Sequence, residues 1–220
     1  MAFPPGCAAG GSSLPDAAPL PHPETVPARD AASLVVLRQG AAGPEMLMGM
    51  RGAGHRFMPN RLVFPGGAVD AADRTAPAAR PLDPLTRARL EKAANADLAH
   101  GLAIAAAREL EEETGLSLGS PPDLGGLHYL CRMVTPPGQP IRFNARFLLV
   151  EAAAVSGTLA GSGELEGLRF FAMAEALAMP IAEPQRKVLG RVRAWLAMSE
   201  AERAAEALVP AYVRHVWVLE

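Results

Sequence analysis

The sequence carries almost no net charge, because its 21 Lys and Arg residues are balanced by 23 Asp and Glu residues. A protein that binds nucleic acid or an acidic membrane through a broad electrostatic surface needs an excess of positive charge. The near-neutral balance gives no indication of such a surface. We therefore expect neither nucleic acid nor a membrane among the partners of this chain.

Cysteine is also scarce, since only Cys7 and Cys131 are present and they lie far apart in the sequence. They form neither a metal-ligand pair nor a disulfide framework, and we interpret them as reduced thiols. No run approaches the roughly 18 consecutive apolar residues of a membrane-spanning helix. A basic segment followed by an apolar run is missing from the N-terminus, so no secretory signal is expected. Together these features predict a cytoplasmic protein.

What the sequence does contain is enough apolar material for one domain: 50% of its 220 residues are hydrophobic. Residues 1–28 include seven prolines and little apolar periodicity, which predicts a flexible tail. The domain is predicted to span residues 29–220. Residues 74–98 are polar and rich in proline, and we interpret them as an insertion that is partly helical.

Short apolar runs and one long periodic segment predict a mixed sheet flanked by helices, an α/β fold. The expected strands cover 31–39, 45–51, 61–67, 126–134, 142–152 and 165–171. The main helix is expected at 98–114, because an apolar stripe recurs every four residues and Gly115 supplies a stop. Residues 183–208 predict one or two further amphipathic helices.

Four glutamates crowd the end of the main helix. On a helical wheel Glu109, Glu112 and Glu113 share one face, whereas Glu111 lies on the other side. Like charges at this spacing repel each other, but a cation between them would reverse the sign, and Mg²⁺ prefers hard oxygen ligands. The alternative is an ordinary solvated acidic face.

The residues around the glutamates favour the metal site. Residues 108–116 read R-E-L-E-E-E-T-G-L, which fits the pattern R-E-U-x-E-E-x-G-U with U a bulky aliphatic residue. This pattern resembles the second half of the Nudix box, the defining motif of the Nudix hydrolases, and the upstream "FPGG" at 64–67 is also common in that family. The resemblance implies the Nudix fold, a mixed sheet sandwiched between helices (α/β/α).

The first half of the box departs from the pattern. The expected glutamate position after Gly67 holds Asp73, and 34 residues separate Asp73 from Arg108 where the box has seven, so about 27 residues are inserted. Without a gap the expected glutamate would fall on His100, which does not match. We interpret Asp73 as the displaced acid and predict that it pairs with Arg108.

The resemblance implies metal-dependent hydrolysis of a diphosphate that links a nucleoside to another group. The cofactor would be Mg²⁺, with Mn²⁺ as an alternative, and a small-molecule nucleotide would be the substrate. The implied metal ligands are Glu109, Glu112, Glu113 and the backbone carbonyl near Gly67. The implied catalytic residues are Glu112 as general base, with Glu109 and Arg108. In this family a later loop carboxylate sometimes serves as base, and Glu164 and Glu166 are the candidates; their alternative is solvation in a loop.

The segment before the box points to one branch of the family. Arg51, Arg56 and Phe64 have the spacing of a signature found in coenzyme A diphosphatases, although that signature expects glycine at Asn60. The implied substrate-binding residues are Arg51, Arg56, Phe64, Gly66 and Gly67. Arginine forks suit phosphate oxygens, but surface solvation of the two arginines is the alternative.

Four other interpretations stay open from the sequence. An ADP-ribose or NADH pyrophosphatase would share the chemistry, and a non-catalytic Nudix module could sense a ligand instead. Arg142 and Arg146 alternate with apolar residues on an expected strand and equally fit a solvent-facing position. Since Nudix folds often form dimers, the resemblance also leaves a homodimer open.

Overall fold

The computed structural model describes residues 26–54 and 57–220. Within these ranges the strands are β1 (Arg29–Gly40), β2 (Gly43–Arg51), β3 (Leu62–Val63), β4 (Gly66–Ala68), β5 (Leu116–Ser117), β6 (His128–Val134), β7 (Phe143–Glu151), β8 (Ser156–Gly157), β9 (Leu165–Ala172), β10 (Pro210–Val213) and β11 (Val216–Leu219). The helices are α1 (Pro84–Leu90), α2 (Ala96–Thr114), α3 (Met173–Ala178), α4 (Glu183–Ala197) and α5 (Glu200–Ala205). Short 3₁₀ turns lie at Ala72–Arg74 and Ala152–Ala154.

The main sheet is mixed and centres on the long strand β1. Its order is β11-β10-β6-β7-β1-β2-β3, with β4 added to β1 and β9 added to β2. β1 runs parallel to β7 on one side and antiparallel to β4 and β2 on the other. β4 pairs with the first part of β1 and β2 with its last part, so the chain between β2 and β4 reaches the middle of the sheet.

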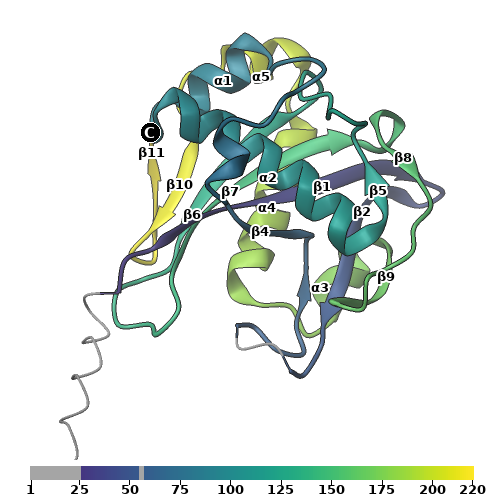
Figure 1. Cartoon of the computed structure of the whole chain (residues 1–220). Coiled ribbons are helices and arrows are strands. Elements are labelled where there is room, and N and C mark those ends of the chain that lie inside the picture. Colours follow the sequence, from purple (N-terminus) through teal and green to yellow (C-terminus); the bar gives the residue numbers. More distant parts are fainter. Residues whose placement is uncertain (1–25, 55–56) are drawn as a thin grey trace, which may run out of the picture.

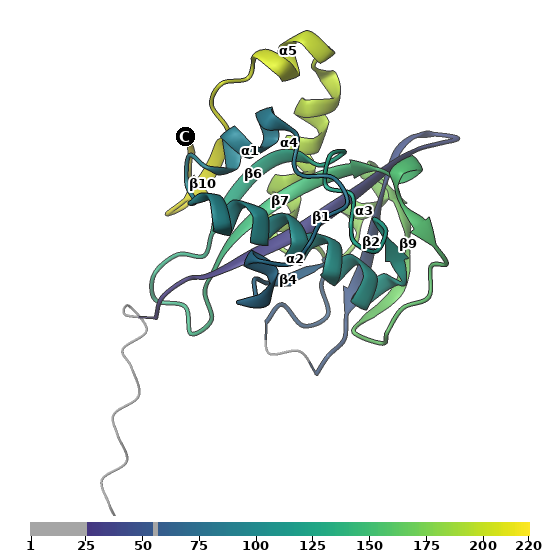
Figure 2. The same ribbon diagram turned by 45° about the horizontal axis from the view of Figure 1, so that its top comes forward.

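Alternate side chains of β1 enter two different cores. Leu34 and Val36 pack with the residues of α2, whereas Val35 and Leu37 pack with those of α4. This two-residue alternation is expected when both faces of a strand are covered. Figures 1 and 2 show α2 on one face of the sheet and α4 on the other. The α/β/α arrangement predicted from the sequence is therefore confirmed.

Local signals set the limits of α2. The Asn95 side chain accepts a hydrogen bond from the Leu98 amide at 2.9 Å and caps the first turn. Gly115 ends the helix in the left-handed conformation with φ 73°. The predicted end at Thr114 is confirmed, and the helix begins two residues earlier than predicted because the Asn95 cap precedes the apolar stripe.

Part of segment 74–98 packs against the domain. Within it, α1 begins at Pro84 under an Asp83 cap, and Leu90 is buried in the core on the α2 side. The Thr86 hydroxyl donates to the Leu127 carbonyl at 2.8 Å just before β6. The division into a tail at 1–28 and a domain with an insertion stays a prediction, and residues 1–25 lie outside the described residues.

The last strands were not predicted from the sequence. Residues 210–219 form the β10–β11 hairpin, which extends the sheet beside β6. Cys131 is buried and unpaired in β6, whereas Cys7 lies outside the described residues. Among the helices of the described ranges, none is both long and apolar enough to cross a membrane.

Candidate active site

The end of α2 lies against the glycines of β4, and Glu113 makes the closest contact. Its Oε2 accepts a hydrogen bond from the Gly66 amide at 2.8 Å, and the residue is only 2% exposed. Gly66 has φ 152°, and a Cβ there would lie 2.4 Å from the Ala32 carbonyl oxygen. Only glycine permits this backbone and this approach to β1. The first glycine of the pair therefore positions the amide that binds Glu113.

The second glycine leaves room for another carboxylate. A Cβ at Gly67 would lie 2.2 Å from Oε1 of Glu109, and no other side chain could occupy that space without displacing the carboxylate. The two neighbouring glycines and the two glutamates of α2 thus fit each other as one cluster. The sequence motifs at 64–67 and 108–115, far apart in the chain, meet at this point.

Arg108 joins the carboxylates to the turn before the insertion. Its Nε and Nη2 donate to the two Asp73 carboxylate oxygens at 3.1 Å each, and Asp73 is only 3% exposed. Nη1 donates to Glu109 at 2.8 Å and to Glu112 at 3.0 Å. The predicted pairing of Asp73 with Arg108 is therefore confirmed. Hydrogen bonding to Asp73 and Glu109 raises the pKa of Arg108 above its ordinary value, so the guanidinium stays charged.

Two of the glutamates have raised pKa values because they are buried. Burial raises the pKa of Glu113 to about 7, against the opposing hydrogen bond from Gly66 and the charge of Arg51. The pKa of Glu109 is also raised by burial, although Arg108 opposes that shift. Neighbouring carboxylates add to both shifts. A cation close to both groups would favour their ionised forms.

The donor set fits a hard divalent cation. Carboxylate oxygens and a backbone carbonyl are what Mg²⁺ prefers, and the glycine pair lets the backbone come close. Within residues 26–54 and 57–220, however, no three His, Cys, Asp or Glu side chains are already gathered as a metal cluster. Arg108 bridges Glu109 and Glu112 instead, which offsets their repulsion.

The raised pKa of Glu113 predicts a pH-dependent stability of the metal-free protein. Ordinary glutamate has a pKa near 4.3, so above that pH the unfolded chain loses a proton that folded Glu113 holds until about pH 7. The contribution of this bound proton to the free energy of unfolding is present in full below about pH 4.3, and it is lost as the pH rises through 7. In EDTA, the melting temperature of the wild type should fall from pH 5.5 to pH 8 relative to that of Glu113→Gln. A difference between the two proteins that does not change with pH would contradict this.

The other acidic residues near the end of α2 and in the loop before β9 differ in their surroundings. Glu112 has a side chain 58% exposed, and Glu111 is exposed on the other side of α2, near Ser117. The loop before β9 bonds to the end of α2, where the Ala160 amide donates to the Thr114 carbonyl at 2.9 Å. Glu164 in that loop raises the pKa values of Glu109 and Glu113. Glu166 lies one position into β9, exposed and paired in register with Met50.

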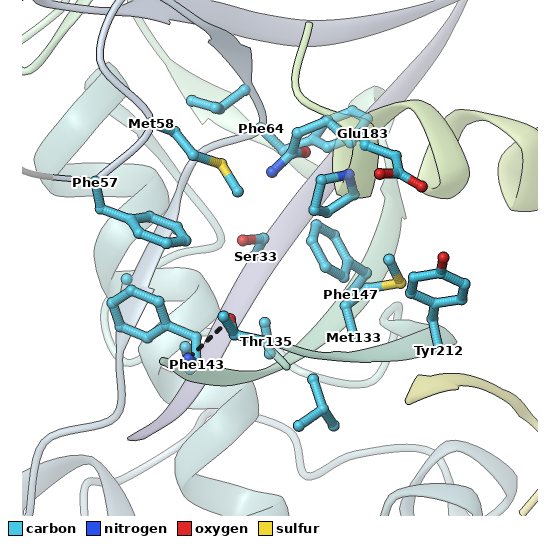
Figure 3. A pocket seen from close by; sticks show the side chains of 18 of the residues that line it. Ser33, Phe57, Met58, Phe64, Met133, Thr135, Phe143, Phe147, Glu183 and Tyr212 are labelled. Carbon is cyan, nitrogen blue, oxygen red and sulfur yellow. Dashed lines mark hydrogen bonds between the residues drawn. The ribbon is translucent and has the colours of Figure 1, made fainter. Parts of the chain in front are cut away.

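A cavity of about 320 Å³ opens beside the cluster. Its lining includes Gly66, Gly67, Glu113, Arg51 and Phe64. Figure 3 shows Phe57 and Phe143 on one side of the cavity and Phe147, Met133 and Tyr212 on the other, with Ser33 between them. Nε of Arg51 is buried and has no hydrogen-bond partner among the described residues. The predicted substrate residues Arg51, Phe64, Gly66 and Gly67 thus share one cavity, whereas Arg56 lies outside the described residues.

Sequence reasoning missed much of this lining. Gln185 at the start of α4 and Tyr212 and His215 of the β10–β11 hairpin also face the cavity. Arg214 and His215 both have positive φ, at 49° and 67°, in the turn of that hairpin. Two-residue hairpin turns of this kind favour Asn-Gly, so this turn is unusual in placing a histidine at the cavity. No spacing signal in the sequence connects these residues to the glutamates.

The backbone conformation of Asn60, the residue that departs from the coenzyme A signature, is one that glycine adopts readily. It has φ 54°, in the left-handed region, where the signature has glycine. Asparagine tolerates this conformation better than most other non-glycine residues. The Asn60 amide donates to the Arg51 carbonyl at 2.9 Å, and the Arg51 amide donates to the Arg61 carbonyl at 2.9 Å. The loop thus keeps the backbone shape that a glycine would allow.

Comparisons with known proteins agree with this geometry. Residues 99–192 match the NUDIX domain family, a range that contains the three glutamates. A NUDIX hydrolase structure from Alicyclobacillus acidocaldarius is 28% identical with a TM-score of 0.62, covering 84% of this chain and 98% of that chain. A MutT NUDIX hydrolase from Burkholderia pseudomallei shares the fold. It is 22% identical with a TM-score of 0.51, and the match covers 76% of this chain and 99% of that chain. No curated protein matches the chain significantly.

Proposed function

We propose that the chain, whose residues 99–192 match the NUDIX domain family, hydrolyses a phosphoanhydride bond in a nucleoside diphosphate-X compound, and that this compound is coenzyme A or an acyl-coenzyme A. The products are then 3′,5′-ADP and 4′-phosphopantetheine, or the acyl form of the latter. The observation that carries the proposal is the position of Arg51, which lines the same cavity as Glu113 and the two glycines. The left-handed Asn60 adds support, since it adopts a conformation that glycine, the residue expected there by the coenzyme A signature, takes readily.

The proposed metal site uses the carboxylates of α2. Nudix hydrolases are typically metal-dependent, and Mg²⁺, or Mn²⁺ in its place, would be held by Glu109, Glu112, Glu113 and the Gly67 carbonyl. When bound, the ion supplies charge stabilisation to the diphosphate. The fork of Arg108 on Asp73 fixes the guanidinium, which in turn holds Glu109 and Glu112 in place.

The chain's own groups account for the rest of the reaction. Arg51 binds a phosphate oxygen of the substrate, which satisfies its buried Nε. Glu112, exposed to solvent, takes the proton of the water that attacks one phosphorus, and the bond from that phosphorus to the bridging oxygen breaks. Glu166 and Glu164 are alternative bases. Of these two, Glu164 has the electrostatic influence on Glu109 and Glu113 that supports such a role.

Incubation of the purified protein with coenzyme A and Mg²⁺, followed by mass spectrometry, tests this proposal. We expect 3′,5′-ADP and 4′-phosphopantetheine, with no products in EDTA. ADP-ribose and NADH are assayed in parallel as competing substrates. Cleavage of either of these without cleavage of coenzyme A would overturn the substrate assignment and leave the enzyme class in place.

A further inference from the structure

Aromatic side chains are concentrated in the cavity. The chain has seven Phe, two Trp and two Tyr residues, and five of these rings line it: Phe57, Phe64, Phe143, Phe147 and Tyr212. The rings of Phe57 and Phe143 meet edge to face at 4.9 Å, and those of Phe64 and Phe147 at 6.3 Å. Figure 3 shows Phe57 and Phe143 pointing toward each other along one side. Such walls favour a planar aromatic group, because every nucleobase has a face that stacks on aromatic side chains.

Besides Arg51, a second polar group of this cavity has no hydrogen-bond partner among the described residues. Gln185, the third residue of α4, lines the cavity and is only 7% exposed. Its Oε1 is buried and accepts no hydrogen bond from any described residue. A buried acceptor without a donor costs free energy, so such a group in a native protein calls for an explanation. A ligand that brings an N–H donor into the cavity would supply the missing bond.

We propose that the cavity binds the nucleobase of the substrate and that Gln185 determines base specificity, its Oε1 accepting a hydrogen bond from an exocyclic amine. The identity of the base rests on the proposed function, because coenzyme A carries adenine. A glutamine amide pairs well with the amine and ring nitrogen at the edge of adenine. Hypoxanthine carries a carbonyl oxygen in place of that amine, so Oε1 would face a second acceptor.

Arg51 fits the same orientation of the ligand. It lines the cavity together with Glu113, and its charge lowers the pKa of that carboxyl. Nε of Arg51 and Oε1 of Gln185 are the two buried atoms of the cavity without a hydrogen-bond partner in the described part of the chain. A nucleotide with its base between the aromatic walls and its phosphates toward Arg51 would satisfy both.

Binding of AMP and IMP, measured by calorimetric titration, tests the proposal. Neither nucleotide contains a phosphoanhydride, so neither can be consumed by a diphosphatase. The wild type should bind AMP about tenfold or more tightly than IMP. In Gln185→Leu the AMP affinity should fall to within about twofold of the IMP affinity. The matched control is Gln139→Leu, since Gln139 lines the same cavity but is exposed, and it should keep the preference of the wild type.

Equal binding of AMP and IMP by the wild type would overturn the proposal, as would a preference that survives in Gln185→Leu. Gln185→Met, which keeps the length of the side chain, replaces the leucine variant if the latter melts at a lower temperature than the wild type. The outcome is separate from that of the coenzyme A assay. A Gln185-dependent preference for AMP without coenzyme A cleavage would retain base recognition and point to another adenine nucleotide, whereas coenzyme A cleavage without the preference would retain only the proposed function.

Discussion

Glu112→Gln is expected to lower kcat by about 10²- to 10⁴-fold, the usual contribution of a positioned general base. The fold should tolerate the change, because the Glu112 side chain is 58% exposed and its partner Arg108 keeps its bonds to Asp73 and Glu109. The melting temperature should therefore stay close to that of the wild type. Steady-state kinetics with the cleaved substrate, at saturating Mg²⁺, measures the effect.

Glu111→Gln is the matched control for this variant. Glu111 is the preceding residue of α2 and is also exposed, but it points toward Ser117 and away from the cluster. Its kcat should stay within about twofold of that of the wild type, since surface substitutions away from a site have small effects. Full activity of Glu112→Gln would remove Glu112 from the mechanism and direct attention to Glu164.

Arg146→Met is expected to lower the free energy of unfolding by about 3–5 kcal/mol, as for a buried ion pair that loses one partner. The Arg146 side chain is 1% exposed, and its Nη1 donates to Asp30 at 2.5 Å and to the Asn144 carbonyl at 2.9 Å. Nη2 donates to the Ala93 carbonyl at 2.7 Å, just before α2. The guanidinium thus connects β7 to β1 and to the segment that leads into α2. Urea denaturation measures the loss.

The control is Arg87→Met, which removes an exposed ion pair. Arg87 and Glu91 meet at 2.7 Å within α1, and the Arg87 side chain is 60% exposed. Exposed pairs of this kind contribute little, so the denaturation midpoint should not change measurably. A midpoint for Arg146→Met as close to the wild type as that of the control would contradict the structural role of Arg146.

The parts of the site that could be predicted lie within one element or follow from a fixed chemical pairing. The face of α2 that carries Glu109, Glu112 and Glu113 follows from the period of a helix, and its end follows from Gly115. Asp73 could be matched to Arg108 across 34 residues because the motif requires an acid and only one stands at the expected distance from Gly67. Both predictions depend on local geometry or on a specific charge pair.

The remaining parts depend on contacts that no local pattern encodes. Arg146 was open to a solvent-facing interpretation, because burial of a charged side chain is costly unless partners compensate it, and the partner Asp30 lies on another strand, 116 residues earlier in the sequence. Gln185 lines the cavity only because α4 packs under the sheet, and Tyr212 because the last hairpin extends it. Periodicity places a residue on a face of its element but does not say which cavity that face meets.

The central claim is that the carboxylates of α2 and the glycine pair of β4 form one metal-binding catalytic centre. The most direct measurement is an anomalous difference map from a crystal grown with Mn²⁺. The account predicts a peak bonded to the carboxylates of Glu109, Glu112 and Glu113 and to the Gly67 carbonyl, with Arg108 still bound to Asp73. A Mn²⁺ peak at other residues in a crystal of active enzyme, with these carboxylates free of metal, would contradict it.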